Sequence, residues 1–159
     1  MSETTMDLQA YVHPAELPAS ETMRVARLLA IDRPETLSDE QLARHVADGL
    51  FPQAAMALSD VVGRRRIMGP VVPEATFRRM LKAGKRLSRN HSERLYGVGR
   101  VVDALGRAYH GDREAIDMFL NQPHPLLEGQ TPFNMARSSS AGTETVLNLI
   151  HRAAAGIVL

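Results

Sequence analysis

The feature that most constrains the fold is a long run of apolar residues at helical spacing between Ser88 and Tyr109. Ser88 suits the cap of such a helix, and the apolar positions recur over about five turns: Leu95, Val98, Val101, Val102, Leu105, Ala108 and Tyr109. Shorter patterns with the same spacing occur elsewhere. No segment alternates apolar and polar residues convincingly at period two, as a half-buried strand does. The sequence therefore predicts an all-α fold.

Local start and stop signals predict the shorter helices. Ser38 followed three residues later by Gln41 resembles a capping box, and apolar residues at helical spacing continue to Leu50. Further signals are Pro52 before one helix and Gly63 after it, Gly111-Asp112 before another, and Thr131-Pro132 before a third. A last helix is predicted from about Ser140 to Ala155, with Gly156 as its stop and with Val146, Leu149, Ile150, Ala153 and Ala154 on its apolar side.

Length and composition restrict the class of protein. A chain of 159 residues suits one ordinary domain or two small modules that share a core. The absence of cysteine excludes disulfides and thiolate sites. Neither a run of apolar residues long enough to cross a bilayer nor a signal peptide is visible, which predicts a cytoplasmic protein without a membrane partner.

Catalytic and metal sites are not predicted. The six histidines are scattered singly, with no acidic partner at the spacing of a metal site. Gly97-Val98-Gly99 resembles the start of a dinucleotide loop, but it lies inside the longest helical pattern, so close helix packing is the better interpretation. Ser138-Ser139-Ser140 suits a helix cap more than a nucleophile. We expect no catalytic residue, no metal, no cofactor and no enzymatic activity.

The basic residues between Arg64 and Arg94 form the one candidate surface for nucleic acid, since the net charge of the whole chain is only +1. Gly69-Pro70 marks a turn, and Pro73 suits the start of a short basic helix whose Phe77, Met80 and Leu81 would pack inward. A helix-turn-helix protein places such a second helix in the major groove of DNA. The predicted DNA-binding residues are Arg64, Arg65, Arg66, Thr76, Arg78, Arg79, Lys82 and Lys85, with Arg86 in support. An ordinary solvated surface remains the alternative.

Two stretches together resemble a known family. They are TFRRMLKAGKRLSRNHSERLYGVGRVVDAL and HPLLEGQTPFNMARSSSAGTETVLNLIHRAAAGIVL, with DREAIDMFL between them. The chain from about Ser38 to Leu159 resembles the Xre/MbcA/ParS antitoxins, and the ParS-like members most. Family members tend to carry a leucine-glycine-glycine-threonine-proline pattern, in which Glu128 here takes one glycine position.

The resemblance implies a domain organisation and a function. Residues 21–87 would form an Xre-like helix-turn-helix region and residues 88–159 a small helical toxin-binding domain. Residues 1–20, which lack sustained periodicity, are predicted to form a flexible arm. The partner would be a RES-domain toxin that consumes NAD or transfers ADP-ribose from it, and the pair would bind promoter DNA to autoregulate the operon. NAD would then belong to the partner and not to this chain.

The end of the chain is the predicted toxin contact. Ile157, Val158 and Leu159 follow Gly156 with no polar residue after them, and His151 and Arg152 would lie at the rim of the contact. The three apolar residues would enter the active-site cleft of the toxin, where the carboxylate of Leu159 could pair with cationic groups. The alternative is a tail that packs against its own helices.

Other functions stay open at this stage. The chain could be a stand-alone helix-turn-helix repressor that senses a small molecule in its C-terminal helical domain. The helix-turn-helix could also be degenerate and serve only dimerisation, because Gly69-Pro70-Val71-Val72 is a stiff and apolar turn for a DNA reader. In each case we expect a homodimer, since helix-turn-helix proteins commonly read paired half-sites.

Overall fold

The structure, a computed structural model, describes residues 5–156, and over these residues it is all-α, which confirms the predicted fold class. The α-helices are α1 (Glu21–Leu28), α2 (Asp39–Asp48), α3 (Gln53–Val62), α4 (Arg64–Ile67), α5 (Glu74–Ala83), α6 (Arg89–Ala108), α7 (Arg113–Asn121), α8 (Pro132–Ser138) and α9 (Ser140–Ala154). Short 3-10 helices are η1 (Leu8–Val12), η2 (Pro14–Glu16), η3 (Pro34–Thr36) and η4 (Pro125–Leu127). Strands are absent from these residues, and Met68 and Val72 form an isolated bridge.

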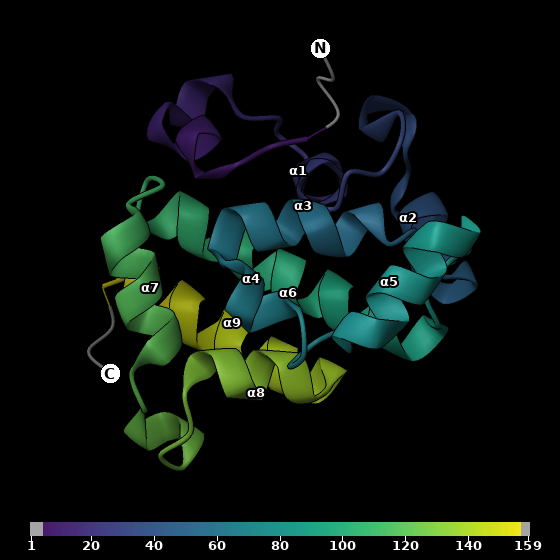
Figure 1. The fold of residues 1–159 in the computed structure, drawn as a ribbon. Helices are drawn as coiled ribbons and strands as arrows, with labels where there is room; N and C mark the ends of the chain where they lie inside the picture. Colours follow the sequence, from purple (N-terminus) through teal and green to yellow (C-terminus); the bar gives the residue numbers. More distant parts are fainter. Residues whose placement is uncertain (1–4, 157–159) are drawn as a thin grey trace.

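The helix α6 is the central element of the fold (Figure 1). It packs against α1, α2 and α3 from the first half of the chain and against α8 and α9 from the second half. The predicted apolar positions Leu95, Val98 and Leu105 are buried, and one hydrophobic cluster joins side chains from both halves. Because α6 is shared in this way, it fixes the two halves of the chain to one another. The boundary after residue 87 stays a prediction.

The glycines of α6 allow close helix contacts. A Cβ atom on Gly97 would overlap the side chain of Thr143 on α9, so any larger residue would force Thr143 or the helix α9 to shift. A Cβ atom on Gly99 would lie 3.6 Å from Leu29, which is ordinary contact. The interpretation of Gly97-Val98-Gly99 as a packing motif is confirmed.

The helix caps lie where local sequence signals predict them. The Ser38 hydroxyl accepts a hydrogen bond from the backbone N–H of Gln41, and the Gln41 side chain accepts one from the backbone N–H of Ser38. At α6 and α8 the side-chain oxygens of Ser88 and Thr131 accept hydrogen bonds from the backbone N–H groups of His91 and Asn134. Each cap satisfies a backbone donor that the first helical turn leaves without a partner.

Part of the segment predicted to be a flexible arm, residues 1–20, packs against the core through η1. Leu8 and Tyr11 on η1 are buried, and the Tyr11 hydroxyl donates a hydrogen bond of 2.7 Å to Asp103 on α6. Asp103 also accepts a hydrogen bond of 2.9 Å from Arg24 on α1, so the three polar side chains form one buried network. The segment is too short to show a helical period, and its partners lie far along the sequence. Its packing could therefore not be predicted from hydrophobic periodicity.

Two further predictions of burial are wrong. Leu81 was expected to pack inward with Phe77 and Met80, but 36% of its surface is exposed. Ala153 and Ala154 were expected on the apolar side of the last helix, and both are exposed. In each case the residue lies in the last turn of its helix. Periodicity gives the face of a helix but not the point at which its partner ends.

Candidate functional site

The second half of the chain forms a helical layer that packs along α6. α9 packs against both α6 and α8, and α8 also meets α7. Thr143 on α9 donates a hydrogen bond of 2.7 Å to the carbonyl of Ala136, which joins α9 to α8. Arg100 on α6 contacts Glu144 on α9 and Glu21 on α1. These contacts hold the layer in one arrangement relative to the N-terminal helices.

The last turn of α9 is not part of this packing. Leu149 and Ile150 are buried, whereas residues 151–156 are all exposed. Gly156 has a φ of 77°, and its N–H donates a hydrogen bond of 3.1 Å to the carbonyl of Ala153, so Gly156 ends the helix as predicted. The predicted contact residues Ile157, Val158 and Leu159 lie outside the described residues. His151, Arg152 and Gly156 thus lie on the exposed turn that leads to them.

Two apolar side chains of this half are exposed that the sequence analysis missed. Met118 on α7 has 61% of its surface exposed, and Leu126 on η4 has 52%. The backbone around Leu126 is well ordered: its N–H donates a hydrogen bond of 3.1 Å to Nδ1 of His124, and the N–H of His124 bonds to the carbonyl of Gln130. Met118 falls on the opposite helical face from the buried Ile116 and Leu120, so the phase of α7 could have revealed it.

Glu128 follows Leu126 and Leu127 in a left-handed conformation, with a φ of 56°. Glycine adopts this conformation without the steric cost that a side chain brings. This is the position at which the resemblance expects a glycine. The turn keeps the glycine-like backbone although the residue has changed.

The helix α7 is braced to the N-terminal half by two arginines. Arg66 on α4 donates hydrogen bonds of 2.7 Å to Asp117 and 3.0 Å to Asn121, both on α7. Arg113 on α7 donates one of 2.9 Å to the carbonyl of Val61 at the end of α3. The Arg66 side chain is therefore mostly buried, in an ion pair with the partly exposed Asp117, and the structure gives it a bracing role beside the DNA contact that the sequence predicts.

The other predicted DNA-binding residues lie on α4, on α5 and just after α5. Glu74 at the start of α5 pairs with both Arg64 and Arg78. The hydrogen bond from Arg64 and the positive charge of Arg78 lower the pKa of Glu74 below its ordinary value of 4.5. Thr76 is half-buried. The remaining basic residues of the set are exposed and make no ion pair within residues 5–156: Arg65, Arg79, Lys82 and Lys85.

The connection between α3 and α5 is longer than the short turn that the sequence suggests. It contains α4 and the turn at Gly69-Pro70, and the N–H of Gly69 bonds to the carbonyl of Val72 at 2.8 Å. A compact helix-turn-helix joins its two helices by three or four residues. The DNA-binding role of α5 stays a prediction, as do the individual residues assigned to it.

The family comparison covers the last third of the chain. Residues 104–156, a third of the chain, match the family described as the antitoxin Xre/MbcA/ParS C-terminal toxin-binding domain. The match supports an antitoxin of this family. The matched region extends from the end of α6 through α7, η4, α8 and α9. The match does not reach residues 38–103, over which the resemblance also extends. No curated protein matches the chain.

Two observations concern metal binding and membrane insertion. Among residues 5–156, no three His, Cys, Asp or Glu side chains are grouped so that they could hold a metal ion. No helix in the same range has the length and apolar character that a membrane crossing requires.

Proposed function

We propose that this chain is the antitoxin of a toxin–antitoxin pair, and that it inhibits a RES-domain, NAD-dependent toxin by covering the active site of the toxin with its C-terminal region. The observation that carries the proposal is the toxin-binding domain at residues 104–156. The exposed turn at residues 151–156 supports the use of the C-terminal end, because its side chains are not buried in the core of the chain itself.

The contact would combine an anchor at the end of the chain with a second anchor on the domain surface. Burial of an aliphatic side chain contributes about 1.5 to 3 kcal/mol, and ordering of its backbone costs about 1 to 2 kcal/mol per residue. Ile157, Val158 and Leu159 alone would therefore give a modest net gain. Met118 and Leu126 are exposed on ordered elements, so their burial would incur little of the ordering cost. We assign both side chains to the toxin-facing surface.

The same chain would bind promoter DNA through its basic surface. Arg65, Arg79, Lys82 and Lys85 are exposed and available to phosphates. Arg64 and Arg78 would have to weaken or break their ion pairs with Glu74 to contact DNA, which reduces what they contribute to the free energy of DNA binding. DNA binding would thus depend strongly on salt and would be separable from toxin binding, because the two surfaces use different helices.

Co-expression tests the proposal. A tagged chain is expressed with the reading frame next to its gene, and capture of the neighbour and bacterial growth are measured. We expect capture of a RES-domain protein whose growth inhibition the chain suppresses. Replacement of both Met118 and Leu126 by Asp should reduce capture, whereas Val12→Asp, an exposed apolar residue on η1, should not. A chain that captures no neighbour but binds a metabolite and represses its promoter alone would be a stand-alone repressor, and the proposal would be wrong.

A further inference from the structure

The turn between η4 and α8 has an unusual backbone conformation. Glu128 has a φ of 56° and Gly129 has a φ of 80°, so two consecutive residues are left-handed. Glycine adopts this conformation freely, whereas the Cβ atom of a glutamate meets a steric penalty in it. Strain of this kind persists where the surrounding structure imposes it, and it is common at binding sites. The left-handed glutamate is therefore a candidate for a functional residue.

Three other residues that are not glycine have a positive φ within residues 5–156: Ala30, Arg33 and His110. Ala30 and Arg33 lie between α1 and η3, outside the region that matches the toxin-binding domain. His110 lies inside that region, in the turn after α6, but histidine is several times more common in left-handed conformations than most side chains are. Within residues 104–156, Glu128 is thus the one left-handed residue whose side chain disfavours that conformation.

Hydrogen bonds and one buried side chain fix this turn. The N–H of Gly129 donates a hydrogen bond of 3.1 Å to the carbonyl of His124, which closes the turn. Leu127 is buried and belongs to the hydrophobic cluster of the core. Leu126 and Glu128, its neighbours on either side, are both exposed. A rigid backbone therefore presents one apolar and one acidic side chain to solvent, which lowers the entropic cost of binding them.

The carboxylate of Glu128 has no structural role among the described residues. Three of the five acidic residues within 104–156 have partners in the chain: Asp112 caps α7, Asp117 pairs with Arg66, and Glu144 pairs with Arg100. Glu114 lies in the first turn of α7, where a negative charge is favourable. Glu128 lies outside the helices, and its side chain makes neither an ion pair nor a hydrogen bond within residues 5–156. Its charge is thus available to another molecule.

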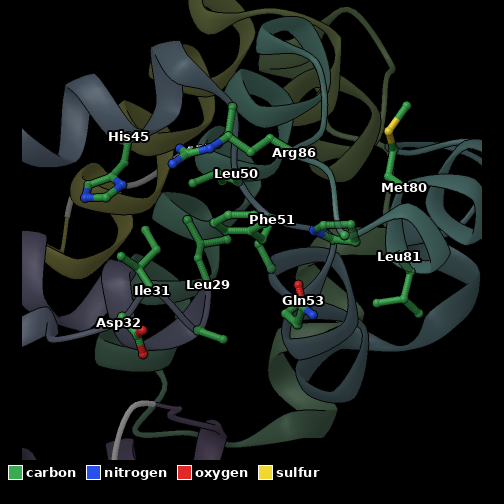
Figure 2. Close-up of a pocket in the computed structure, with 15 residues that line it drawn as sticks. Leu29, Ile31, Asp32, His45, Leu50, Phe51, Gln53, Met80, Leu81 and Arg86 are labelled. Atoms are coloured by element: carbon green, nitrogen blue, oxygen red, sulfur yellow. Dashed lines mark hydrogen bonds between the residues drawn. The ribbon is translucent and has the colours of Figure 1, made fainter.

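The exposed Leu126 differs from the exposed aromatic residue of the N-terminal half. Phe51 lies in the middle of a hollow of about 420 Å³, with Leu29 on one side and Leu81 on the other (Figure 2). The guanidinium of Arg86 lies 4.8 Å from the centre of the Phe51 ring, so the chain itself supplies contacts to this ring. Leu126 lies instead on a turn that projects beyond α7 and α8 at the bottom of Figure 1. A projecting turn can enter a hollow on a partner.

We propose that this turn selects the toxin by charge: Leu126 enters an apolar hollow on the toxin, and the carboxylate of Glu128 pairs with a Lys or Arg side chain at the edge of that hollow. The inference rests on the proposed function, because the turn lies inside the region that matches the toxin-binding domain. Such a pair favours a toxin with a cation at this place and rejects one with an acid there. Glycine would relieve the strain at position 128 but would not supply the charge.

The experiment separates strain from charge with two substitutions in the complete chain. Calorimetry measures the dissociation constant for the toxin from the co-expression experiment, and circular dichroism measures the melting temperature of the free chain. Glu128→Gly relieves the strain and removes the charge, so it should raise the melting temperature by about 1 to 4 °C and raise the dissociation constant about tenfold. Glu128→Gln keeps the strain and removes only the charge. It should weaken binding by a similar factor without raising the melting temperature.

A charge reversal and a control complete the test. Glu128→Lys should weaken binding more than Glu128→Gln does, because it brings two cations together. Glu40→Gln removes an exposed acid on α2, outside the matched region, and should change neither quantity.

Four results would overturn the proposal: toxin binding unchanged by Glu128→Gln, Glu128→Lys no weaker than Glu128→Gln, equal weakening by Glu40→Gln, or a melting temperature that Glu128→Gly lowers. If the wild-type chain binds the toxin and one of these results is found, the proposed function stands and only the role of Glu128 is wrong. A wild-type chain that binds no toxin overturns both.

Discussion

Removal of the Asp103 carboxylate should cost a large part of the stability of this protein. Asp103 and Arg24 are both almost fully buried, and they are joined at 2.9 Å. Tyr11 donates its hydroxyl hydrogen to the same carboxylate oxygen at 2.7 Å. Arg24 additionally donates to the carbonyls of Pro18 and Ala19, which fixes the guanidinium in place. The variant Asp103→Ala leaves a buried cation and a buried hydroxyl without their shared partner.

The magnitude follows from these contacts. Removal of one partner from a buried ion pair costs about 3 to 5 kcal/mol, and an unsatisfied buried hydroxyl adds about 1 to 3 kcal/mol. The free energy of unfolding of a single domain is about 5 to 15 kcal/mol, so Asp103→Ala should be close to unfolding. Tyr11→Phe keeps the ion pair and removes one hydrogen bond to a charged acceptor, which should cost about 1.5 to 3 kcal/mol.

Urea unfolding followed by circular dichroism measures these differences. Asp60→Ala is the matched control, because Asp60 is an exposed aspartate on α3, and it should change the free energy of unfolding by less than about 0.5 kcal/mol. If Asp103→Ala costs less than about 1 kcal/mol, the buried network does not hold the N-terminal segment, and our account of η1 is refuted.

Three further predictions concern helix packing, pH and DNA. Gly97→Ala should lower the free energy of unfolding by about 1 to 3 kcal/mol because of the overlap with Thr143, whereas Gly99→Ala should be neutral or stabilising by up to about 1 kcal/mol; equal effects of both would contradict the close contact. Burial, followed by the charge of Asp103, raises the pKa of Tyr11 above its ordinary value of 10.0, so the folded state retains this proton longer than the unfolded chain and stability should fall as the pH rises above that value. Tyr11→Phe should show a shallower fall in urea titrations, and an equally steep fall would argue against the shift. Replacement of Arg78 and Arg79 by Ala should weaken promoter binding and reduce its salt slope by about one unit for each phosphate that the variant no longer neutralises, while Arg44 and Arg107 replaced by Ala serve as the control of equal charge; an unchanged slope would favour a surface without DNA contacts.

Features set by neighbouring residues could be predicted from the sequence. The capping box at Ser38 and the caps at Ser88 and Thr131 depend on donors three residues away, so the local pattern contains the whole interaction. The burial of α6 follows from its period alone. The end of α9 at Gly156 could be predicted from the local sequence. The exposure of its last turn could not, because exposure depends on which other helices cover that turn.

Contacts between distant residues could not be predicted. Tyr11 and Asp103 are 92 positions apart, and no rule of composition relates them. Arg66 was assigned to the DNA surface because it stands beside Arg64 and Arg65, but two of its hydrogen-bond partners, Asp117 and Asn121, lie on α7, more than fifty residues later. A run of basic residues on a short helix necessarily points in several directions. The sequence indicates the charge of the segment and not the direction of each side chain.

Inhibition of the captured toxin by a shortened chain tests the central claim most directly. The intact chain and a chain that ends at Gly156 are titrated into an assay of NAD consumption by the toxin from the co-expression experiment. Loss of Ile157, Val158 and Leu159 removes a modest net contribution, and about 1.4 kcal/mol corresponds to a tenfold change in affinity, so we expect the concentration for half inhibition to rise roughly tenfold. The shortened chain should keep its helical content and its oligomeric state. If it inhibits as strongly as the intact chain, the C-terminal end does not cover the active site, and the proposed mode of inhibition is wrong.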